Sequence, residues 1–179
     1  AALEVGQDER PSPVAFAVAM STDRKWTVLG MAGRRRDGSL YVQAMESRPG
    51  TRWAVDRLVD LRSKWRPVAV AVDGTGPAAA LVPALEKVRL PVKMLSTRDM
   101  ARGCGALFDA AAEGELHHGG GALLARSLAV AGKRTVGDAW VWREPDGADI
   151  SPLRAVTAAL QVLLTAQKST RSGLVTGIR

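Results

Sequence analysis

Two short, nearly unbroken apolar runs constrain the fold of this chain more than any other feature. Residues 14–20 read VAFAVAM and residues 68–72 read VAVAV. Each run is too short for a typical helix, and turn-forming residues follow each one. Strands that are apolar on both faces belong in the centre of a sheet, and the second run fits a parallel strand best. We therefore predict an α/β chain with a central sheet.

The remaining segments alternate between strand and helix periodicity. Two predicted strands follow the first run over short connections, which favours an antiparallel meander. Helical spacing then begins behind Thr51 and stops before Pro67. The later predicted elements are a strand over 68–72, a helix over 78–88, a strand over 91–95, helices over 97–113 and 123–131, an extended piece over 139–142, and a helix over 152–166 behind Ser151-Pro152.

Three antiparallel strands followed by alternating strands and helices predict a mixed sheet with helices on both faces. This order resembles that of the RNase H-like fold. The chain of 179 residues is long enough for one such domain, which we place at 14–167. Residues 1–13 have the proline-punctuated composition of a linker from a longer polypeptide, and residues 168–179 are predicted to form a flexible basic tail.

Charge and cysteine content narrow the classes of function. The net charge of +7 favours a polyanionic partner. Nucleic acid is a better candidate than a membrane surface, because the sequence shows no long basic amphipathic helix. The single cysteine, Cys104, excludes an internal disulfide and a cysteine-rich zinc module. Without a spanning segment or a signal-peptide pattern, we expect a soluble protein inside the cell.

Asp73 is the first candidate site residue. It follows five apolar residues directly, where a carboxylate is costly unless it is paired, hydrogen-bonded or bound to a cation. Ligands of parallel sheets bind beyond the carboxyl ends of the central strands, which favours metal ligation or catalysis at Asp73. The alternative is that Asp73 accepts hydrogen bonds from the turn Gly74-Thr75-Gly76 and caps the next helix.

Two late acids are further candidates. Asp149 precedes the last helix, where it could equally serve as a cap, and Asp138 lies in a predicted turn. Hydrolysis of a phosphodiester by two divalent ions requires several carboxylates at one point, because hard oxygens hold Mg²⁺ or Mn²⁺. The first strand should contribute another acid from its carboxyl end, but it carries Ala19.

These residues resemble a known family, the nuclease domain of the large terminase subunit of tailed double-stranded DNA phages. The resemblance runs from about Val14 to Leu164, and it depends on the order and spacing of several stretches together. They are VAFAVAMSTDR, RPGTRWAVDRLVDL, WRPVAVAVDGTGPAAALVPALE, RDMARGCGALFDAAAEGELHH, KRTVGDAWVWR and DISPLRAVTAAL.

The resemblance implies an RNase H-like endonuclease that cuts concatemeric DNA during genome packaging with two divalent ions, Mg²⁺ or Mn²⁺. It implies metal-ligand roles for Asp73 and Asp149, with Asp138 as the alternative to Asp149. The family has an aspartate where this chain has Ala19, so either the acid was deliberately replaced or this lineage lost it. The chain itself is therefore expected to be inactive or weakened.

The resemblance also implies partners and a location. The implied partners are double-stranded DNA, an ATPase motor domain of the same polypeptide, the portal and the small terminase subunit. The implied location is the procapsid portal in the host cytoplasm, not a membrane. Two basic runs are candidate DNA contacts, Arg34-Arg35-Arg36 and Lys133-Arg134, although such runs are often only solvated loops. The alternatives are a resolvase- or transposase-type nuclease and a non-catalytic DNA-binding or portal-docking module.

Overall fold

The computed structural model describes residues 10–175, with side chains up to residue 169. This part of the chain contains a six-stranded mixed sheet in the order β5-β4-β1-β2-β3-β6. Residues 1–9 of the expected linker and 176–179 of the expected tail lie outside the described residues. The strands are β1 Val14–Met20, β2 Trp26–Arg34, β3 Leu40–Pro49, β4 Ala69–Asp73, β5 Lys93–Leu95 and β6 Leu116–His118.

The pairing confirms the predicted mixed sheet. β1 is antiparallel to β2 and β2 is antiparallel to β3, whereas β4 pairs with β1 and β5 with β4 in parallel. In the parallel pair Val18 lies opposite Val72, and in the antiparallel pair Ala19 lies opposite Val28. The carboxyl ends of β1 and β4 are therefore neighbours at one end of the sheet.

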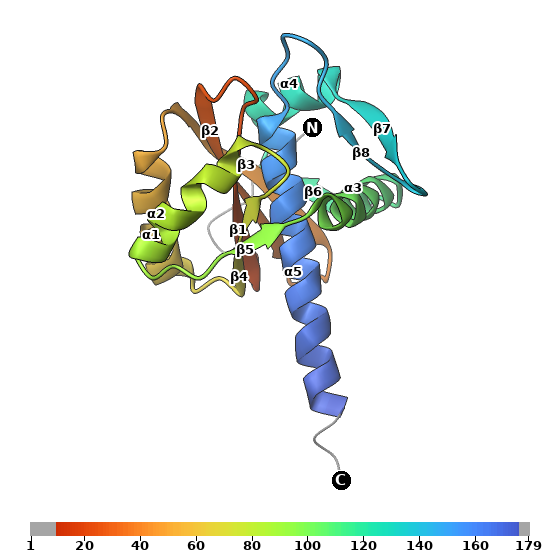
Figure 1. Ribbon diagram of the computed structural model, residues 1–179. Helices are drawn as coiled ribbons and strands as arrows, with labels where there is room; N and C mark the ends of the chain where they lie inside the picture. The colour runs from red at the N-terminus through yellow and green to blue at the C-terminus, as the bar shows by residue number, and fades with distance from the viewer. Residues whose placement is uncertain (1–9, 176–179) are drawn as a thin grey trace.

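Helices cover both faces of the sheet (Figure 1). On one face the apolar cluster joins strand residues to α1 and α2, and on the other it joins them to α3, α4 and α5. The helices are α1 Arg52–Trp65, α2 Val82–Lys87, α3 Thr97–Ala112, α4 Ala122–Val130 and α5 Ser151–Val175, and a 3₁₀ turn, Pro77–Leu81, precedes α2. This is the two-sided covering that the apolar runs predict.

Alternation along β1 decides which side chains reach each layer. Phe16 and Val18 face α1, whereas Ala15 and Ala17 face α5. Small residues on the second face let α5 lie close to the strands. The closest approach is at Gly30 of β2, where a Cβ would stand 2.5 Å from the carbonyl carbon of Ala155.

The second, two-stranded sheet is a hairpin of β7 Gly132–Val136 and β8 Ala139–Arg143, which projects over α3 in Figure 1. The sequence indicated only the second of these strands, and it gave no sign of β6. β7 is polar and mostly exposed, so it lacks the alternation that marks a half-buried strand. β6 has three residues and forms only because β3 offers a free edge.

Most element boundaries shift by a few residues from the prediction, and three differences are informative. α5 continues to Val175, so the segment from Lys168 is helical up to that residue rather than a loose tail. The helix expected over 78–88 begins as a 3₁₀ turn. The cap of α3 is Ser96 rather than Thr97, because the Ser96 hydroxyl accepts from the backbone N–H of Asp99. Within the described residues, no helix is both long and apolar enough to cross a membrane.

Candidate functional site

Asp73 lies at the carboxyl end of β4, directly beside the end of β1 that carries Ala19. Both residues are one position beyond the Val18–Val72 pair. Ala71 and Ala17, two residues earlier, belong to the cluster under α5, so Asp73 and Ala19 face that same side. Asp73 is 1% exposed and Ala19 is fully buried. The structure thus places the predicted acid next to the position where the family has another acid.

The two carboxylate oxygens of Asp73 have different partners. Oδ1 accepts hydrogen bonds from the Thr75 backbone N–H at 3.0 Å and from the Thr75 hydroxyl at 2.6 Å. Oδ2 accepts no hydrogen bond within the described residues, but the Arg154 Nη2 forms an ion pair with it at 2.6 Å. Arg154 Nη2 also donates to the Thr75 hydroxyl at 2.8 Å.

The structure therefore agrees in part with the alternative in which Asp73 accepts hydrogen bonds from the turn and caps the next helix. Its carboxylate accepts hydrogen bonds from the turn that follows β4, as the turn hypothesis expects. It does not cap the next helical segment, because the N-cap there is Gly76 and no side chain caps it.

A cleft of about 400 Å³ opens beside this pair of charges. α5 contributes Arg154, the β7–β8 hairpin contributes Arg134 and Arg143, and the loop after the hairpin contributes Glu144. Three guanidinium groups and one carboxylate give the cleft walls a positive balance, which attracts anions. Cys104 of α3 also lines it, and burial raises the pKa of this thiol to about 11.

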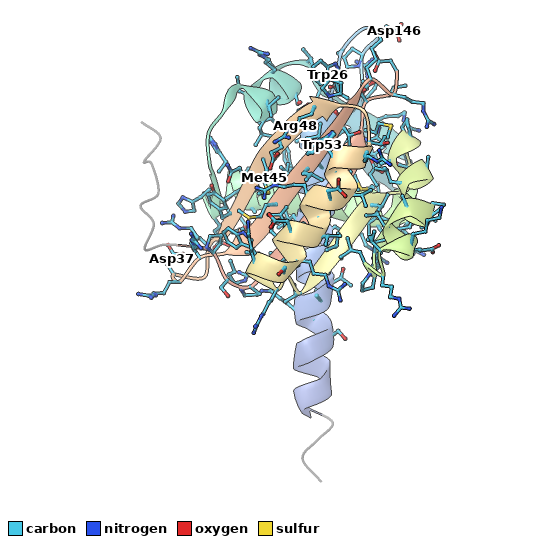
Figure 2. All side chains as sticks on the ribbon, turned by 90° about the vertical axis from the view of Figure 1, so that its left-hand side faces the viewer. Trp26, Asp37, Met45, Arg48, Trp53 and Asp146 are labelled. Carbon is cyan, nitrogen blue, oxygen red and sulfur yellow. The ribbon has the colours of Figure 1, made fainter. Side chains whose placement is uncertain are left out.

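Asp149 lies in the loop before α5, but it lines a different pocket. Its Oδ1 accepts a hydrogen bond from the Ser151 backbone N–H at 2.8 Å and so satisfies the first N–H of α5, a helix-terminus role like the cap considered above. The pocket beside it, about 380 Å³, is lined by Trp26 of β2 and Arg126 of α4. Figure 2 shows the same loop, marked by Asp146, at the end of the sheet where Trp26 lies.

The three acids predicted from the sequence do not line one common pocket within the described residues. Asp73 and Asp149 lie on the same end of the molecule, but the structure does not bring their side chains into one cleft. Asp138 is exposed in the turn between β7 and β8. Ala19 packs against Val28 and Ala155. A ligand role for either late acid stays a prediction.

The two basic runs lie in different parts of the structure. Arg34-Arg35-Arg36 is at the β2–β3 turn, the end of the sheet opposite to Asp73, and Figure 2 shows Asp37 of this turn far from Trp26. Lys133 lies over the rings of Phe108 and Trp140 at 3.6 and 4.3 Å. Arg134, by contrast, lines the cleft beside Asp73.

No protein-family profile matches the sequence, and no curated protein does. Solved structures do match. The HK97 bacteriophage large terminase superposes with a TM-score of 0.68 at 13% identity, over 86% of this chain and 40% of that one. The large terminase nuclease of the thermophilic phage G20c superposes with a TM-score of 0.62 at 15% identity, over 87% of this chain and 83% of that one.

The chain has the fold of large terminase nuclease domains. It spans 40% of the length of the HK97 protein and most of the isolated G20c nuclease. Further structures of the G20c nuclease contain magnesium or cobalt. The RNase H-like architecture expected from the element order is thereby confirmed.

The terminase nuclease fold raises the question of whether this chain could hold two divalent ions. Within residues 10–175 no group of three or more His, Cys, Asp or Glu side chains is arranged to hold a metal ion. Asp73 Oδ2 is the one buried carboxylate oxygen in this range without a hydrogen bond, and Arg154 contacts it. Ala19 supplies no ligand. The side chains as arranged do not fit a two-ion centre.

Sequence reasoning missed Arg154, Arg143 and Glu144. Arg143 and Glu144 carry no spacing that distinguishes them from ordinary surface charges. Arg154 did carry a signal, since it is the only charged residue in the predicted helical segment 152–166. A lone charge in an otherwise apolar and small-residue helix requires a partner outside that helix.

Proposed function

We propose that this chain is the nuclease-type domain of a phage DNA-packaging terminase and that DNA is its substrate. The observation that carries the proposal is the terminase nuclease fold with a buried acid, Asp73, at the carboxyl end of β4. Its expected partners are an ATPase motor of the same polypeptide, the portal and the small subunit. They place its action at the procapsid portal in the host cytoplasm.

The cleft supports a phosphodiester substrate. Arg134, Arg143 and Arg154 line it from two directions, the hairpin and α5. Guanidinium groups bind phosphate oxygens without reading base sequence, because they contact only the backbone. Such binding suits a domain that must cut concatemers of any sequence.

In its present form the domain should bind DNA and cleave it weakly or not at all. The family position for the first acid holds Ala19, and the Asp149 carboxylate is engaged at the start of α5. Mg²⁺ or Mn²⁺ is the cofactor that the resemblance implies, with Asp73 and Asp149, or Asp138 in place of Asp149, as the remaining ligands. An aspartate at position 19 would stand beside Asp73 on the neighbouring strand.

A non-catalytic DNA-binding module is the second candidate, and one observation favours it. The Asp73 carboxylate is already neutralised by Arg154. A domain that has lost one acid and has a cation beside another is arranged to bind a polyanion rather than to cut it.

The deciding experiment is nicking and linearisation of plasmid DNA by this chain and by Ala19→Asp, in saturating Mn²⁺, in saturating Mg²⁺ and in EDTA. The nuclease proposal expects ion-dependent cleavage by Ala19→Asp that exceeds that of the parent chain by about 100-fold or more. Addition of Asp73→Ala to Ala19→Asp should abolish it. If circular dichroism shows a folded Ala19→Asp that binds DNA but does not cut, the non-catalytic module is correct.

A further inference from the structure

The Asp73–Arg154 ion pair is unusual because it is buried at the end of the sheet. The Asp73 side chain is 1% exposed and the Arg154 side chain 14% exposed, and Nη2 lies 2.6 Å from Oδ2. Taking two charges out of water is costly, so such a pair persists only where its geometry is well supported. Thr75 provides that support, since its hydroxyl donates to Asp73 and accepts from Arg154.

The absence of a side chain at Gly76 leaves space for the guanidinium of Arg154. A Cβ at Gly76 would lie 2.5 Å from Nη2 of Arg154 and 3.1 Å from its Cζ. Gly76 has φ −128° and ψ −172°, an extended conformation that any residue can adopt. A side chain at position 76 would therefore push the Arg154 guanidinium aside, although the backbone conformation itself would accept one.

Arg154 and a divalent cation would compete for the same oxygen. Mg²⁺ binds carboxylate oxygens at roughly 2.0–2.1 Å and carries its own shell of water. A cation bound to Oδ2 would lie within a few ångströms of the guanidinium nitrogen that is 2.6 Å from the same oxygen, so the two positive groups would repel each other. The neighbouring Arg134 and Arg143 add further positive charge to the cleft.

We propose that Arg154 is a built-in competitor of divalent cations at Asp73. The guanidinium neutralises the carboxylate in the resting protein, and a cation binds there only after Arg154 has moved away. The inference rests on the proposed function in one respect only, that Asp73 lies where the fold binds its ions. It adds that the lost acid at position 19 is one of two obstacles to ion binding, and that Arg154 is the other.

The test measures Mn²⁺ binding without DNA, by isothermal titration and by the electron paramagnetic resonance of free Mn²⁺. Two folded proteins are compared, Ala19→Asp and Ala19→Asp with Arg154→Met. Methionine keeps the unbranched stem of the side chain and removes the guanidinium and its charge. The double variant should bind Mn²⁺ about tenfold more tightly or better, because a cation a few ångströms from the site is gone. Saturating Mn²⁺ should also raise its Tm, by roughly 5 °C.

Arg143→Met in the same Ala19→Asp background is the matched control. It removes an identical charge from the same cleft, but from a side chain with no ion pair to Asp73 within the described residues. The proposal expects a gain in Mn²⁺ affinity of less than about threefold from this change. An equal gain from Arg143→Met and Arg154→Met would overturn the proposal, since general electrostatics would then explain both.

Gly76→Ala provides an independent route if Arg154→Met does not fold, because it keeps the charge and displaces the guanidinium. Tighter Mn²⁺ binding by Ala19→Asp with Gly76→Ala supports the proposal, and unchanged affinity in every folded variant sinks it. The outcome is separable from the nuclease proposal. Tighter Mn²⁺ binding without DNA cleavage would uphold the role of Arg154 and refute the nuclease proposal. Cleavage by Ala19→Asp together with an unchanged Mn²⁺ affinity on Arg154→Met would uphold the nuclease proposal and refute the role of Arg154.

Discussion

The two faces of the central sheet are built from the same strands but differ in the size of the side chains that these strands place on them. The face toward α1 and α2 is packed with large apolar side chains, such as Phe16, Leu29 and Leu58. On the face toward α5 the central strands β1, β2 and β4 contribute mainly small side chains, such as Ala17 and Ala71, and the large ones, such as Leu160, come mainly from the helices. The buried polar residues that accompany α5 are Asp73, Ser151, Thr157 and Gln161.

The difference assigns a packing role to the strand residues of the first face and the placement of the Asp73–Arg154 pair to the second. Large side chains bury most apolar area per residue, so the strand positions on the first face contribute more to stability than the alanines of the same strands on the second. Small side chains bring the backbone of α5 close to the strands, and that approach delivers Arg154 to Asp73. Asp73 pairs with Arg154, and the Thr157 hydroxyl accepts from Trp142 Nε1 at 3.0 Å. The buried Ser151 hydroxyl, by contrast, has no hydrogen bond within the described residues.

The largest effect should come from the large-residue face. Phe16→Ala removes a fully buried ring that packs edge-on against Trp65 at 6.3 Å between centroids. We expect a loss of about 3–5 kcal/mol in the free energy of unfolding, measured by urea denaturation. Val59→Ala, at a position 41% exposed on α1, should change it by less than about 0.5 kcal/mol. Equal losses would contradict the contrast between core and surface.

Gly30→Ala tests the close approach on the other face. The added Cβ would meet the backbone of Ala155, which cannot move aside as a flexible side chain can. We expect a loss of about 1–3 kcal/mol in the free energy of unfolding. Gly105→Ala is the matched control, because nothing lies within 4 Å of its Cβ in α3, and it should stabilise by about 0.5–1 kcal/mol. An unchanged free energy of unfolding in Gly30→Ala would show that the packing of α5 does not depend on this close approach.

The charge at the Asp73 end can be compared with the charge at the opposite end by DNA binding. Loss of Arg134 and Arg143 together should weaken binding by roughly tenfold and reduce the salt dependence by about two ion equivalents. Loss of Arg34 and Arg36 removes the same charge from the far end of the sheet and should weaken binding less. Fluorescence anisotropy across a salt series measures both. Equal losses would mean that DNA contacts both ends.

The smallest effect concerns the thiol of Cys104, which packs with Ala101 and Val141 and lines the cleft beside Asp73. Burial raises its pKa from the ordinary 9.0 to about 11, so it stays protonated at pH 8. The native protein should not react with a disulfide reagent at that pH, whereas the urea-unfolded protein should react fully. Because the folded pKa is the higher one, its contribution to stability is complete below about pH 9 and is lost as the pH rises toward 11. Rapid reaction of the native thiol would show that the reagent reaches Cys104 through the cleft and would contradict its burial.

The element order followed from local patterns. The two apolar runs became β1 and β4, and the helical spacing behind Thr51 became α1. These elements were predictable because their periodicity is strong and is carried by neighbouring residues. β6 and β7 were not, because one is three residues long and the other is polar, and pairing with another strand is what makes each of them extended.

The sequence by itself determined that β1 to β5 are strands, that the sheet is mixed, and that Asp73 stands at the end of a buried strand. Tertiary structure alone decided that Arg154 reaches Asp73 across 81 positions of sequence, and that Asp149 faces a pocket apart from it. Periodicity reports which way a side chain points relative to its neighbours in the chain. It carries no information on which distant side chain lies opposite, because that depends on how closely α5 packs on the sheet.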